Sequence, residues 1–412
     1  MNSGRNSSGP SHPVRRGIVA LAVFVLNLTL GWGAASPKSA PDELQVQVGK
    51  TVEIASASEY NWFPTVHKFT TGEIMVTIRM SPDEMRPARM FSAYCISRDG
   101  GLTWGRRYPM GEDADMDGAW SEAFQKDGKV WHLYTPLEPY PAGQTQAFHA
   151  SLSKFSRGGT EATIARDVVI RLSEPMHMLS LRALDRRSSD NERIGEEISG
   201  FPWGPILEGL NGDVMAPVYY KAERDQRYYR LALIRSSDGG KSWNEYSTIA
   251  AVAPEEKPWP GMGNEGPCEA GLVRLADKRL YSIFRTGSDG FMGNVWSSDD
   301  GKTWTKPTST PYKGVALRVR RLSNGVLACT TGRPGPVVVM FSVDGTGEKW
   351  SHITPIFDCK STHYTDFIEV EPGKLFVVYD SVPYGWYEIP YADRESKNVI
   401  YGTFVEVRKE RP

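Results

Sequence analysis

The chain has 412 residues, of which 40% are hydrophobic, 11% aromatic and 24% charged, and this composition excludes a disordered chain and a coiled coil. With 48 Lys and Arg against 49 Asp and Glu, the net charge of −1 gives no electrostatic argument for a nucleic-acid partner or for an anionic membrane surface. The 40 glycines and 28 prolines, without a helical rhythm, favour short strands joined by tight turns, as in an all-β propeller or sandwich.

The first 35 residues predict an export signal. Arg5, Arg15 and Arg16 precede an apolar run over residues 17–30, and small residues follow at 33–35. The apolar run is short for a membrane span, and the small residues suit cleavage after export. We therefore expect residues 1–35 to be removed on export to the periplasm or the outside of the cell, and residues 36–412 to form one domain. An uncleaved N-terminal anchor is the alternative.

A repeated phrase, Ser-x-Asp-x-Gly-x-Thr/Ser-Trp, occurs intact at residues 97–104, 236–243 and 297–304. A fourth copy with one inserted residue spans 342–350, and residues 153–160 look like a decayed fifth. The Asp carboxylate can accept N–H bonds inside a turn, Gly supplies a positive φ, and Trp packs beneath. The phrase therefore predicts a hairpin turn with a structural role.

This phrase resembles the Asp box, or BNR repeat, of the sialidase (neuraminidase) superfamily. The resemblance implies that each box lies between the outer two strands of a propeller blade. It is specific for the fold and nearly silent on function, because Asp-box propellers include non-catalytic proteins.

Alternating apolar segments before each box predict an all-β, six-bladed β-propeller with Asp-box hairpins. Residues 43–48 would close the ring as the fourth strand of the last blade. Residues 164–200, rich in Arg, Ser, Asp and Glu, are predicted to be a surface loop or lid. The expected blades are 62–104, 120–160, 201–243, 265–304, 315–350 and 364 to about 407.

Candidate site residues lie in the last three of these blades. Glu269 and Arg285 lie on successive strands joined by a hairpin, and Arg333 comes nine residues before the Ser of its box. The resemblance to sialidases implies that these are a glutamate and two of the three arginines that hold the substrate. It also implies that Tyr364 is the catalytic tyrosine and that Asp380 is an acid supporting an arginine.

The chemistry of that set explains the choice of residue types. A sialic acid carries a carboxylate on its anomeric carbon, which arginines bind and which repels an anionic nucleophile. A tyrosine is neutral at pH 7, with an ordinary pKa of about 10, so Tyr364 would attack as Glu269 takes its proton. The resemblance therefore implies a double displacement that retains the configuration at the anomeric carbon.

The first blade departs from the family pattern. Where the family has Phe/Tyr-Arg-Ile-Pro, this chain has Asn61-Trp62-Phe63-Pro64, so a tryptophan replaces one arginine. Trp62 either stacks on a sugar face at the pocket rim or packs in the core. Asp83 lies where the family keeps its acid, with Glu84 as the substitute. The candidates to replace the missing arginine are Arg79, Arg86 and Arg89.

We therefore expect an exported exo-glycoside hydrolase that releases a terminal acidic sugar, sialic acid or a related one, from a glycan or glycoconjugate. No cofactor or metal is implied, because the histidines lack ligand spacing and the calcium-like stretch from Asp113 has Phe124 at its twelfth position. The four cysteines permit disulfides but equally fit buried thiols. Two alternatives fit the same residues: a non-catalytic carbohydrate-binding or scaffold propeller, and an enzyme acting on a different sugar such as a uronic acid.

Overall fold

The structure is a computed structural model that describes residues 44–58, 60–80, 92–109, 124–126, 129–139, 146–155, 162–182, 193–198, 200–384 and 395–409. All of these residues lie in the unit Asp42–Pro412, and the regular elements within them are β-strands. Across these ranges, no helix is long and apolar enough to cross a membrane. The expected export signal lies outside the described residues.

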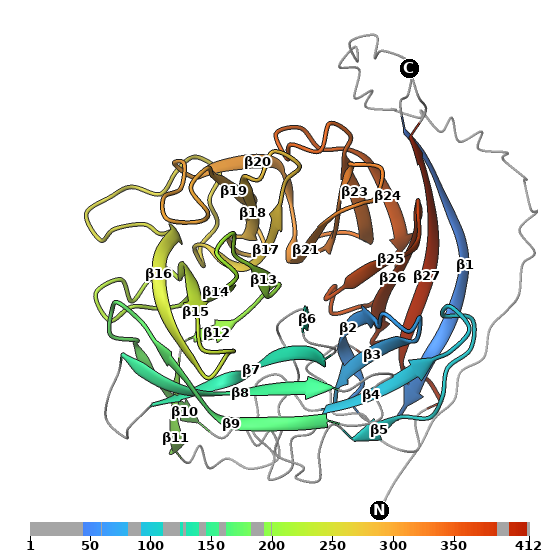
Figure 1. The fold of residues 1–412 in the computed structure, drawn as a ribbon, viewed down its shortest axis with the longest axis horizontal. Helices are drawn as coiled ribbons and strands as arrows, with labels where there is room; N and C mark the ends of the chain where they lie inside the picture. Colours follow the sequence, from blue (N-terminus) through green and yellow to red (C-terminus); the bar gives the residue numbers. More distant parts are fainter. Residues whose placement is uncertain are drawn as a thin grey trace, which may run out of the picture. The chain divides into compact units, whose positions relative to one another are not determined.

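The strands form the blades of a β-propeller, and four of its sheets contain four antiparallel strands each (Figure 1). The innermost strands of neighbouring sheets contact one another, as β2 does with β25 and β17 with β21. Two of these sheets are β2 (Trp62–Lys68), β3 (Ile74–Arg79), β4 (Ser92–Ser97) and β5 (Tyr108–Pro109), and β17 (Cys268–Arg274), β18 (Leu280–Arg285), β19 (Phe291–Ser297) and β20 (Thr308–Lys313). The other two are β21 (Val315–Arg321), β22 (Leu327–Gly332), β23 (Val337–Ser342) and β24 (Ser351–Phe357), and β25 (Asp366–Glu371), β26 (Lys374–Ser381), β27 (Asn398–Lys409) and β1 (Leu44–Ala57).

The predicted closing strand is confirmed. Strand β1, from the start of the described chain, pairs antiparallel with β27 from its end, with Leu44 opposite Lys409 and Ala57 opposite Asn398. The pairing extends well beyond the expected residues 43–48. The first described strand is therefore the outermost strand of the last blade, and its backbone hydrogen bonds to β27 join the two ends of the described fold.

The prediction of six blades is wrong, because the described strands form five. The expected second and third blades share one nine-stranded sheet, in which β9 pairs in parallel with β16, with Val169 opposite Ser242 and Arg171 opposite Asn244. A separate two-stranded ribbon, β10 (Met178–Arg182) and β11 (Arg193–Ile198), follows β9. Strands β9 to β11 thus cover about half of the segment that we predicted as a surface loop. The strands of the large sheet are β6 (Phe124–Lys126), β7 (Lys129–Pro139), β8 (Ala147–Phe155), β9 (Ala162–Arg171), β12 (Gly200–Pro202), β13 (Leu207–Glu208), β14 (Val214–Tyr220), β15 (Arg230–Ser236) and β16 (Ser242–Ala250).

The Asp boxes form the expected turns between the outer two strands of four blades, at β4–β5, β15–β16, β19–β20 and β23–β24. In the first box, the Ser97 hydroxyl donates to Asp99 over 2.8 Å, and Asp99 also accepts the Thr103 N–H over 2.9 Å. The fourth box keeps the Ser-to-Asp bond at 2.8 Å despite its inserted residue. Residues 156–160 of the decayed fifth copy lie outside the described residues. These turns are set by local hydrogen bonds, which is why the sequence alone could locate them.

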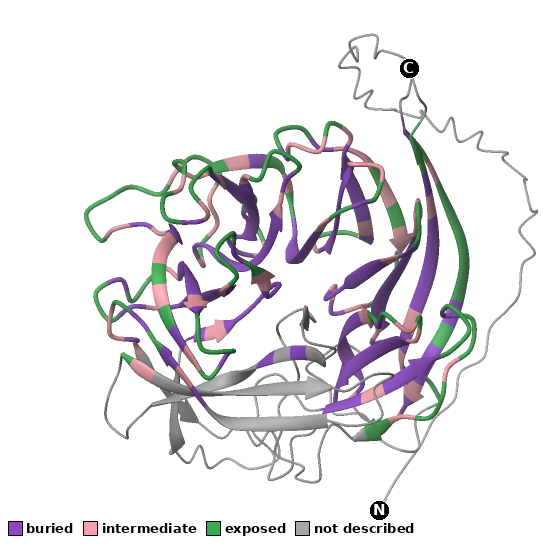
Figure 2. Ribbon diagram, viewed as in Figure 1, coloured by how far each residue is buried: buried purple, intermediate pink, exposed green. Residues whose placement is uncertain are grey.

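The hydrophobic core lies between adjacent sheets and along the inner strands, and the exposed residues gather in the outer turns (Figure 2). One buried cluster contains residues from the inner strands of several blades, and Trp62, Trp203, Ala316 and Tyr364 are among its members. The backbone there is held by packing from neighbouring blades. The side chains at the start of the inner strands are therefore fixed by the whole ring.

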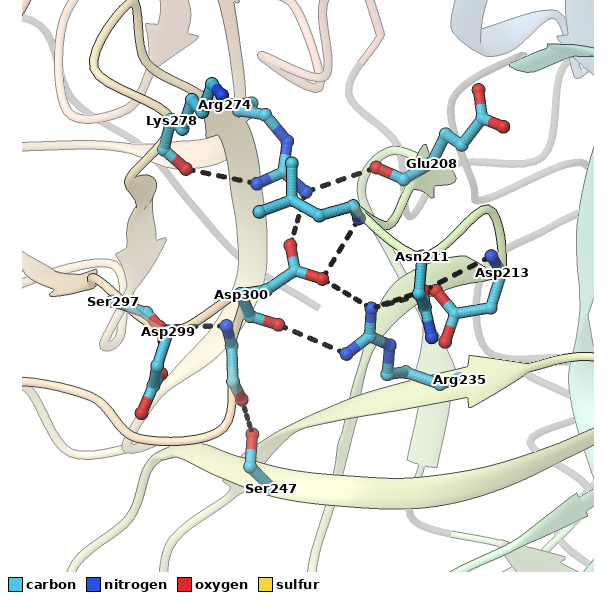
Figure 3. Close-up of polar contacts among 12 residues, drawn as sticks. Glu208, Asn211, Asp213, Arg235, Ser247, Arg274, Lys278, Ser297, Asp299 and Asp300 are labelled. Carbon is cyan, nitrogen blue, oxygen red and sulfur yellow. Dashed lines mark hydrogen bonds and ion pairs between the residues drawn. The ribbon is translucent and has the colours of Figure 1, made fainter.

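An ion-pair network ties the large sheet to the next blade (Figure 3). Asp300, which follows Asp299 of the box turn at residues 297–304, accepts from Arg235 of β15 and from Arg274 of β17, each over 2.6 Å. Arg235 also donates to Asp213 over 2.8 Å. The side chains of Arg235 and Asp300 are only 10% and 14% exposed, so this network is largely shielded from solvent.

Candidate functional site

Three inner strands begin with the same distortion. Phe63 of β2, Glu269 of β17 and Ala316 of β21 each stand second in their strand and have φ values of 49°, 41° and 51°. At each position the pairing with the next strand shifts register, as at a β-bulge. Non-glycine residues seldom adopt a positive φ, and such conformations cluster at functional sites. This end of the inner strands is therefore the candidate site.

Tyr364 and Glu269 meet at this end. The Tyr364 hydroxyl donates to Glu269 Oε1 over 2.5 Å, and the Ala316 N–H donates to Glu269 Oε2 over 2.9 Å. Tyr364 is 7% exposed and Glu269 is 4% exposed. The three residues come from, or directly precede, the inner strands of three successive blades. The carboxylate of Glu269 is thus placed by contacts on both of its oxygens.

Glu269 is an ionised carboxylate in this arrangement. Burial by itself raises its pKa, but the Arg285 guanidinium and the hydrogen bonds from Tyr364, Ala316 and Arg285 outweigh burial, so the pKa lies below its ordinary value of 4.5. At neutral pH the group is a carboxylate that already accepts the Tyr364 proton in a hydrogen bond. It can take that proton when the phenol reacts.

Aromatic rings hold the Tyr364 side chain from two directions. The Phe63 ring centroid lies 4.3 Å from that of Tyr364, and the Trp203 ring meets it edge-on at 5.5 Å. An arginine backs each of these rings: the Arg79 guanidinium lies 5.6 Å from the Phe63 centroid, and that of Arg318 lies 4.4 Å from the Trp203 centroid. The orientation of the phenol is therefore fixed by packing as well as by its hydrogen bond.

Arg285 lies beside this pair. Its Nη1 donates to Glu269 Oε1 over 2.8 Å and contacts the Tyr364 hydroxyl oxygen at 3.5 Å. Its Nη2 donates to Glu265 Oε1 over 2.7 Å and to the Ser288 hydroxyl over 3.4 Å. The two nearby carboxylates outweigh burial and raise the pKa of Arg285 above its ordinary value. The guanidinium is therefore a permanent cation beside Tyr364 and Glu269.

Arg333 reaches the same place from the next blade. Its Nη2 donates to the Thr362 carbonyl over 2.8 Å, two residues before Tyr364, and its Nη1 donates to the Ser288 hydroxyl over 3.5 Å. Ser288 therefore links the two predicted substrate arginines, Arg285 and Arg333. The structure brings together Tyr364, Glu269, Arg285 and Arg333, which sequence alone placed in three different blades.

The other predicted site residues take different places. Trp62 is fully buried, with its ring 4.8 Å from that of Tyr60 and 5.5 Å from that of Phe63, so it has no face to offer a sugar. Of the two alternatives stated for Trp62, the structure therefore supports packing in the core. Arg79 lies opposite Trp62 in the pairing of β2 with β3 and is 5% exposed, so its guanidinium is beneath Phe63 rather than open to a substrate.

Asp380 has a different role from the one that the resemblance implied. Its carboxylate accepts the N–H groups of Phe63 and Thr362 over 3.1 Å and 2.7 Å and the Ser361 hydroxyl over 2.9 Å, and the Thr362 hydroxyl bonds to it as well. These partners are backbone and hydroxyl groups, so Asp380 braces the loop before Tyr364 and joins it to β2. The expected acid, Asp83, and its neighbours Glu84, Arg86 and Arg89 lie outside the described residues.

Sequence reasoning missed three residues of the site: Glu265, Trp203 and Arg318. One signal for Trp203 was available, because Trp203-Gly-Pro205 repeats the pattern of Trp62-Phe-Pro64 at the start of another blade. Arg318 is 2% exposed and lies on an inner strand among apolar residues, which is an unusual position for an arginine. Nothing in the local sequence distinguishes Glu265 from an ordinary surface acid.

The described residues contain no group of three or more His, Cys, Asp or Glu side chains that could hold a metal ion. The four cysteines are free thiols, with Cys359 exposed and the other three buried.

Comparison with known proteins places the fold. Residues 189–377 match the family described as the BNR repeat-like domain. A crystal structure of a protein of unknown function from Dyadobacter fermentans DSM 18053 is similar to the chain, with a TM-score of 0.64 and 18% identity over 88% of this chain and 99% of that one. No curated protein matches the sequence.

Two further similar structures are glycoside hydrolases. The α-L-arabinanase of Penicillium chrysogenum, complexed with arabinobiose, has a TM-score of 0.59 and 12% identity over 87% of this chain and 98% of that one. The Hadza microbial sialidase Hz136 has a TM-score of 0.56 and 13% identity over 85% of this chain and 66% of that one. At these identities the structures show the fold alone. These structures show a β-propeller fold, and the match to the BNR repeat-like domain covers residues 189–377.

Proposed function

We propose that the protein is an exported exo-glycoside hydrolase, starting from the match of residues 189–377 to the BNR repeat-like domain. In this proposal it releases a terminal acidic sugar, sialic acid or a related one, from glycans. The observation that carries the proposal is the 2.5 Å hydrogen bond from the Tyr364 hydroxyl to Glu269, with Arg285 in contact with both groups. A buried phenol paired with an ionised carboxylate is the arrangement that an activated tyrosine nucleophile needs.

The reaction proceeds by double displacement. Glu269 takes the phenol proton as the Tyr364 oxygen attacks the anomeric carbon, and the bond to the leaving group breaks as an acid donates a proton to the departing oxygen. We assign that acid to Asp83. Water, deprotonated by the same residue, then attacks the anomeric carbon, the bond to Tyr364 breaks, and Glu269 returns the proton. The configuration at the anomeric carbon is retained.

Arg285 and Arg333 hold the acidic group of the sugar in this proposal. Both reach the Ser288 hydroxyl, at 3.4 and 3.5 Å, so their guanidinium groups lie near one another at the site. Arginine binds a carboxylate through two parallel N–H groups and stays charged at any working pH. A neutral nucleophile such as Tyr364 avoids the repulsion that an aspartate or glutamate would meet from the same substrate.

A second candidate function is hydrolysis of a different sugar, a uronic acid or a neutral one. Trp62 stands where the sialidase pattern has an arginine and is fully buried, so the described part of the first blade lacks that contact to the substrate. The arabinanase of similar fold supports a neutral sugar as one class to test. A propeller that binds glycans without cleaving them is the remaining alternative.

The experiment that tests the proposal is release of a fluorescent aglycone by the purified protein from an α-linked N-acetylneuraminic acid, with uronides and neutral furanosides in parallel. We expect turnover of the sialoside and loss of turnover in Tyr364→Phe, with Tyr246→Phe, a solvent-facing tyrosine, as the matched control. Turnover of another sugar only would show that the substrate is that sugar and not a sialoside. Silence on every sugar would leave glycan binding as the activity.

Export is part of the proposal and has its own test. Residues 1–35 contain the arginines, apolar run and small residues of a cleavable signal. We expect the protein in the periplasm or medium to begin near residue 36, which N-terminal sequencing of the exported form measures. A full-length chain retained in the membrane fraction would instead support the N-terminal anchor.

A further inference from the structure

We propose that Glu265 competes with the acidic group of the substrate for Arg285, and that this competition sets how strongly the site prefers an acidic over a neutral sugar. This inference rests on the proposed function, because it takes the sugar to bind beside Tyr364 and Arg285. It assigns a role in specificity to a residue that donates no proton and forms no bond in the reaction.

Only one nitrogen of the Arg285 guanidinium, Nη2, lies where a substrate could bind it, and Glu265 already occupies that nitrogen. Nη1 faces Glu269 and Tyr364, at 2.8 and 3.5 Å. Nε is buried and has no hydrogen-bond partner among the described residues. Nη2 is the remaining nitrogen, and Glu265 Oε1 already lies 2.7 Å from it. A substrate carboxylate that approaches Nη2 of Arg285 therefore finds the Glu265 carboxylate already bound there.

Glu265 is held in this position by its backbone. Its N–H donates to the Thr286 carbonyl over 3.1 Å, and its carbonyl accepts the Tyr229 N–H over 2.8 Å. Its second carboxylate oxygen lies 3.9 Å from the thiol of Cys268, whose pKa burial raises well above 9, so that group stays a thiol. Because the chain is fixed on both sides, Glu265 binds Arg285 without the ordering cost that a free ligand pays.

Exposure distinguishes the two carboxylates that hold Arg285. The Glu265 side chain is 31% exposed, whereas that of Glu269 is 5% exposed. Glu265 is thus on the solvent side of the guanidinium, where a substrate enters, and Glu269 is on the inner side. Together the two carboxylates outweigh the single positive charge of Arg285, and Arg333 brings these four groups to zero net charge, so a further anion is attracted less than it would be by an unpaired Arg285.

An acidic sugar must therefore displace Glu265 from Nη2 or share the guanidinium with two carboxylates. A neutral sugar binds without displacing Glu265 and without repulsion from the two carboxylates. Removing the charge of Glu265 frees Nη2 for the substrate and removes the repulsion at once, so it raises the affinity for the acid but not for its neutral analogue.

The test compares two ligands of the same shape: the methyl α-glycoside of N-acetylneuraminic acid and the methyl ester of that glycoside, which lacks the charge. Their dissociation constants are measured by calorimetry for the wild-type protein, Glu265→Gln and Glu265→Ser. Asp289→Asn is the matched control, because Asp289 is an exposed acid four residues after Arg285 and has no described contact with it. Thermal unfolding of each variant identifies any that fails to fold, and two replacements of different size keep the test open.

We expect the ratio of acid to ester affinity to rise by at least about tenfold, equivalent to ~1.4 kcal/mol, in both Glu265 variants and to stay unchanged in Asp289→Asn. An unchanged or lower ratio in folded Glu265 variants overturns the inference, as does an equal rise in Asp289→Asn, which would show a general charge effect. Hydrolysis is assayed separately. A Glu265→Gln protein that gains affinity for the acid but cleaves no sugar would support this inference while the proposed function fails.

Discussion

Tyr364 and Glu269 are 95 positions apart in the chain, yet the Tyr364 hydroxyl lies 2.5 Å from Glu269 Oε1. The other oxygen of Glu269 accepts the Ala316 N–H of the intervening blade. Three blades therefore meet at one carboxylate. The geometry of this pair depends on how the blades pack, so changes at the pair and changes that loosen the packing have distinguishable effects.

Replacing Glu269 with Gln is expected to lower kcat by roughly 10²–10⁴-fold, because the amide can accept the Tyr364 hydrogen bond but cannot take its proton. KM should change less than kcat. Steady-state kinetics on the sugar identified by the substrate panel measure both values. Glu369→Gln is the control, because Glu369 lies on β25 and its carboxylate accepts from Ser323 and Gly373 rather than from the Tyr364 hydroxyl. A Glu269→Gln protein with wild-type kcat would exclude Glu269 as the base.

The fall of kcat/KM at low pH should reflect the lowered pKa of Glu269. Because Arg285 and the hydrogen bonds hold this pKa below 4.5 against the effect of burial, the base stays ionised, and kcat/KM falls only as the pH drops through the folded pKa. The stabilising contribution of this carboxylate likewise persists above its ordinary pKa and disappears through the same lower range. In Arg285→Met, burial is no longer opposed by the cation, so this fall moves to higher pH. A pH profile that coincides in the two proteins would contradict this assignment.

Asp380→Ala should destabilise the protein by about 3 kcal/mol, because it leaves buried N–H groups of Phe63 and Thr362 without their acceptor. Urea unfolding measures this change. The loop before Tyr364 loses its brace, so kcat should fall for every substrate that the enzyme accepts. If Asp380 instead supported an arginine that binds the acidic group, the loss would appear mainly as a higher KM for acidic sugars.

Asp300→Ala should cost about 2 kcal/mol of stability, because Arg235 and Arg274 lose a shared, largely shielded partner. Activity per folded molecule should not change, since the network lies outside the candidate site. Asp277→Ala is the matched control: its pair with Arg279 is 52% and 34% exposed and should be worth less than about 1 kcal/mol. Urea unfolding measures both changes. Equal destabilisation would contradict the claim that the shielded network stabilises the fold more than the exposed Asp277–Arg279 pair does.

The Asp boxes predict how the fold responds to acid. Hydrogen bonds, first among them that from the Thr103 hydroxyl, lower the pKa of Asp99 to about 2. For Asp238 burial raises the pKa, but the hydrogen bonds from Ser242, Ser236 and Lys241 together outweigh burial and again give a pKa of about 2. Each carboxylate thus stabilises the fold above its ordinary pKa of 3.8 and loses that effect as the pH falls through about 2. Thermal unfolding between pH 5 and pH 2 should show a falling Tm, and Asp99→Asn should flatten this dependence; an equally steep fall in that variant would contradict it.

The sequence by itself located the turns of the propeller and the strand that closes it. A box such as residues 97–104 makes its hydrogen bonds within a few positions, so its chemistry can be read from adjacent letters. The alternation of residues 43–48 likewise predicted a strand whose partner, β27, the structure confirms. The sequence also named Tyr364, Glu269, Arg285 and Arg333, because each matches a family motif at its own position.

Only the tertiary structure decided which of these residues meet and how many blades there are. The parallel contact of β9 with β16 merges two expected blades, and no local pattern specifies a pairing between strand edges some 70 residues apart. The burial of Trp62 and the contact of Glu265 with Arg285 are of the same kind, because each depends on groups brought together by packing between separate elements. Local hydrogen bonding is encoded by neighbours in sequence, whereas the charge and shape of the site follow from contacts that exist only once the ring has closed.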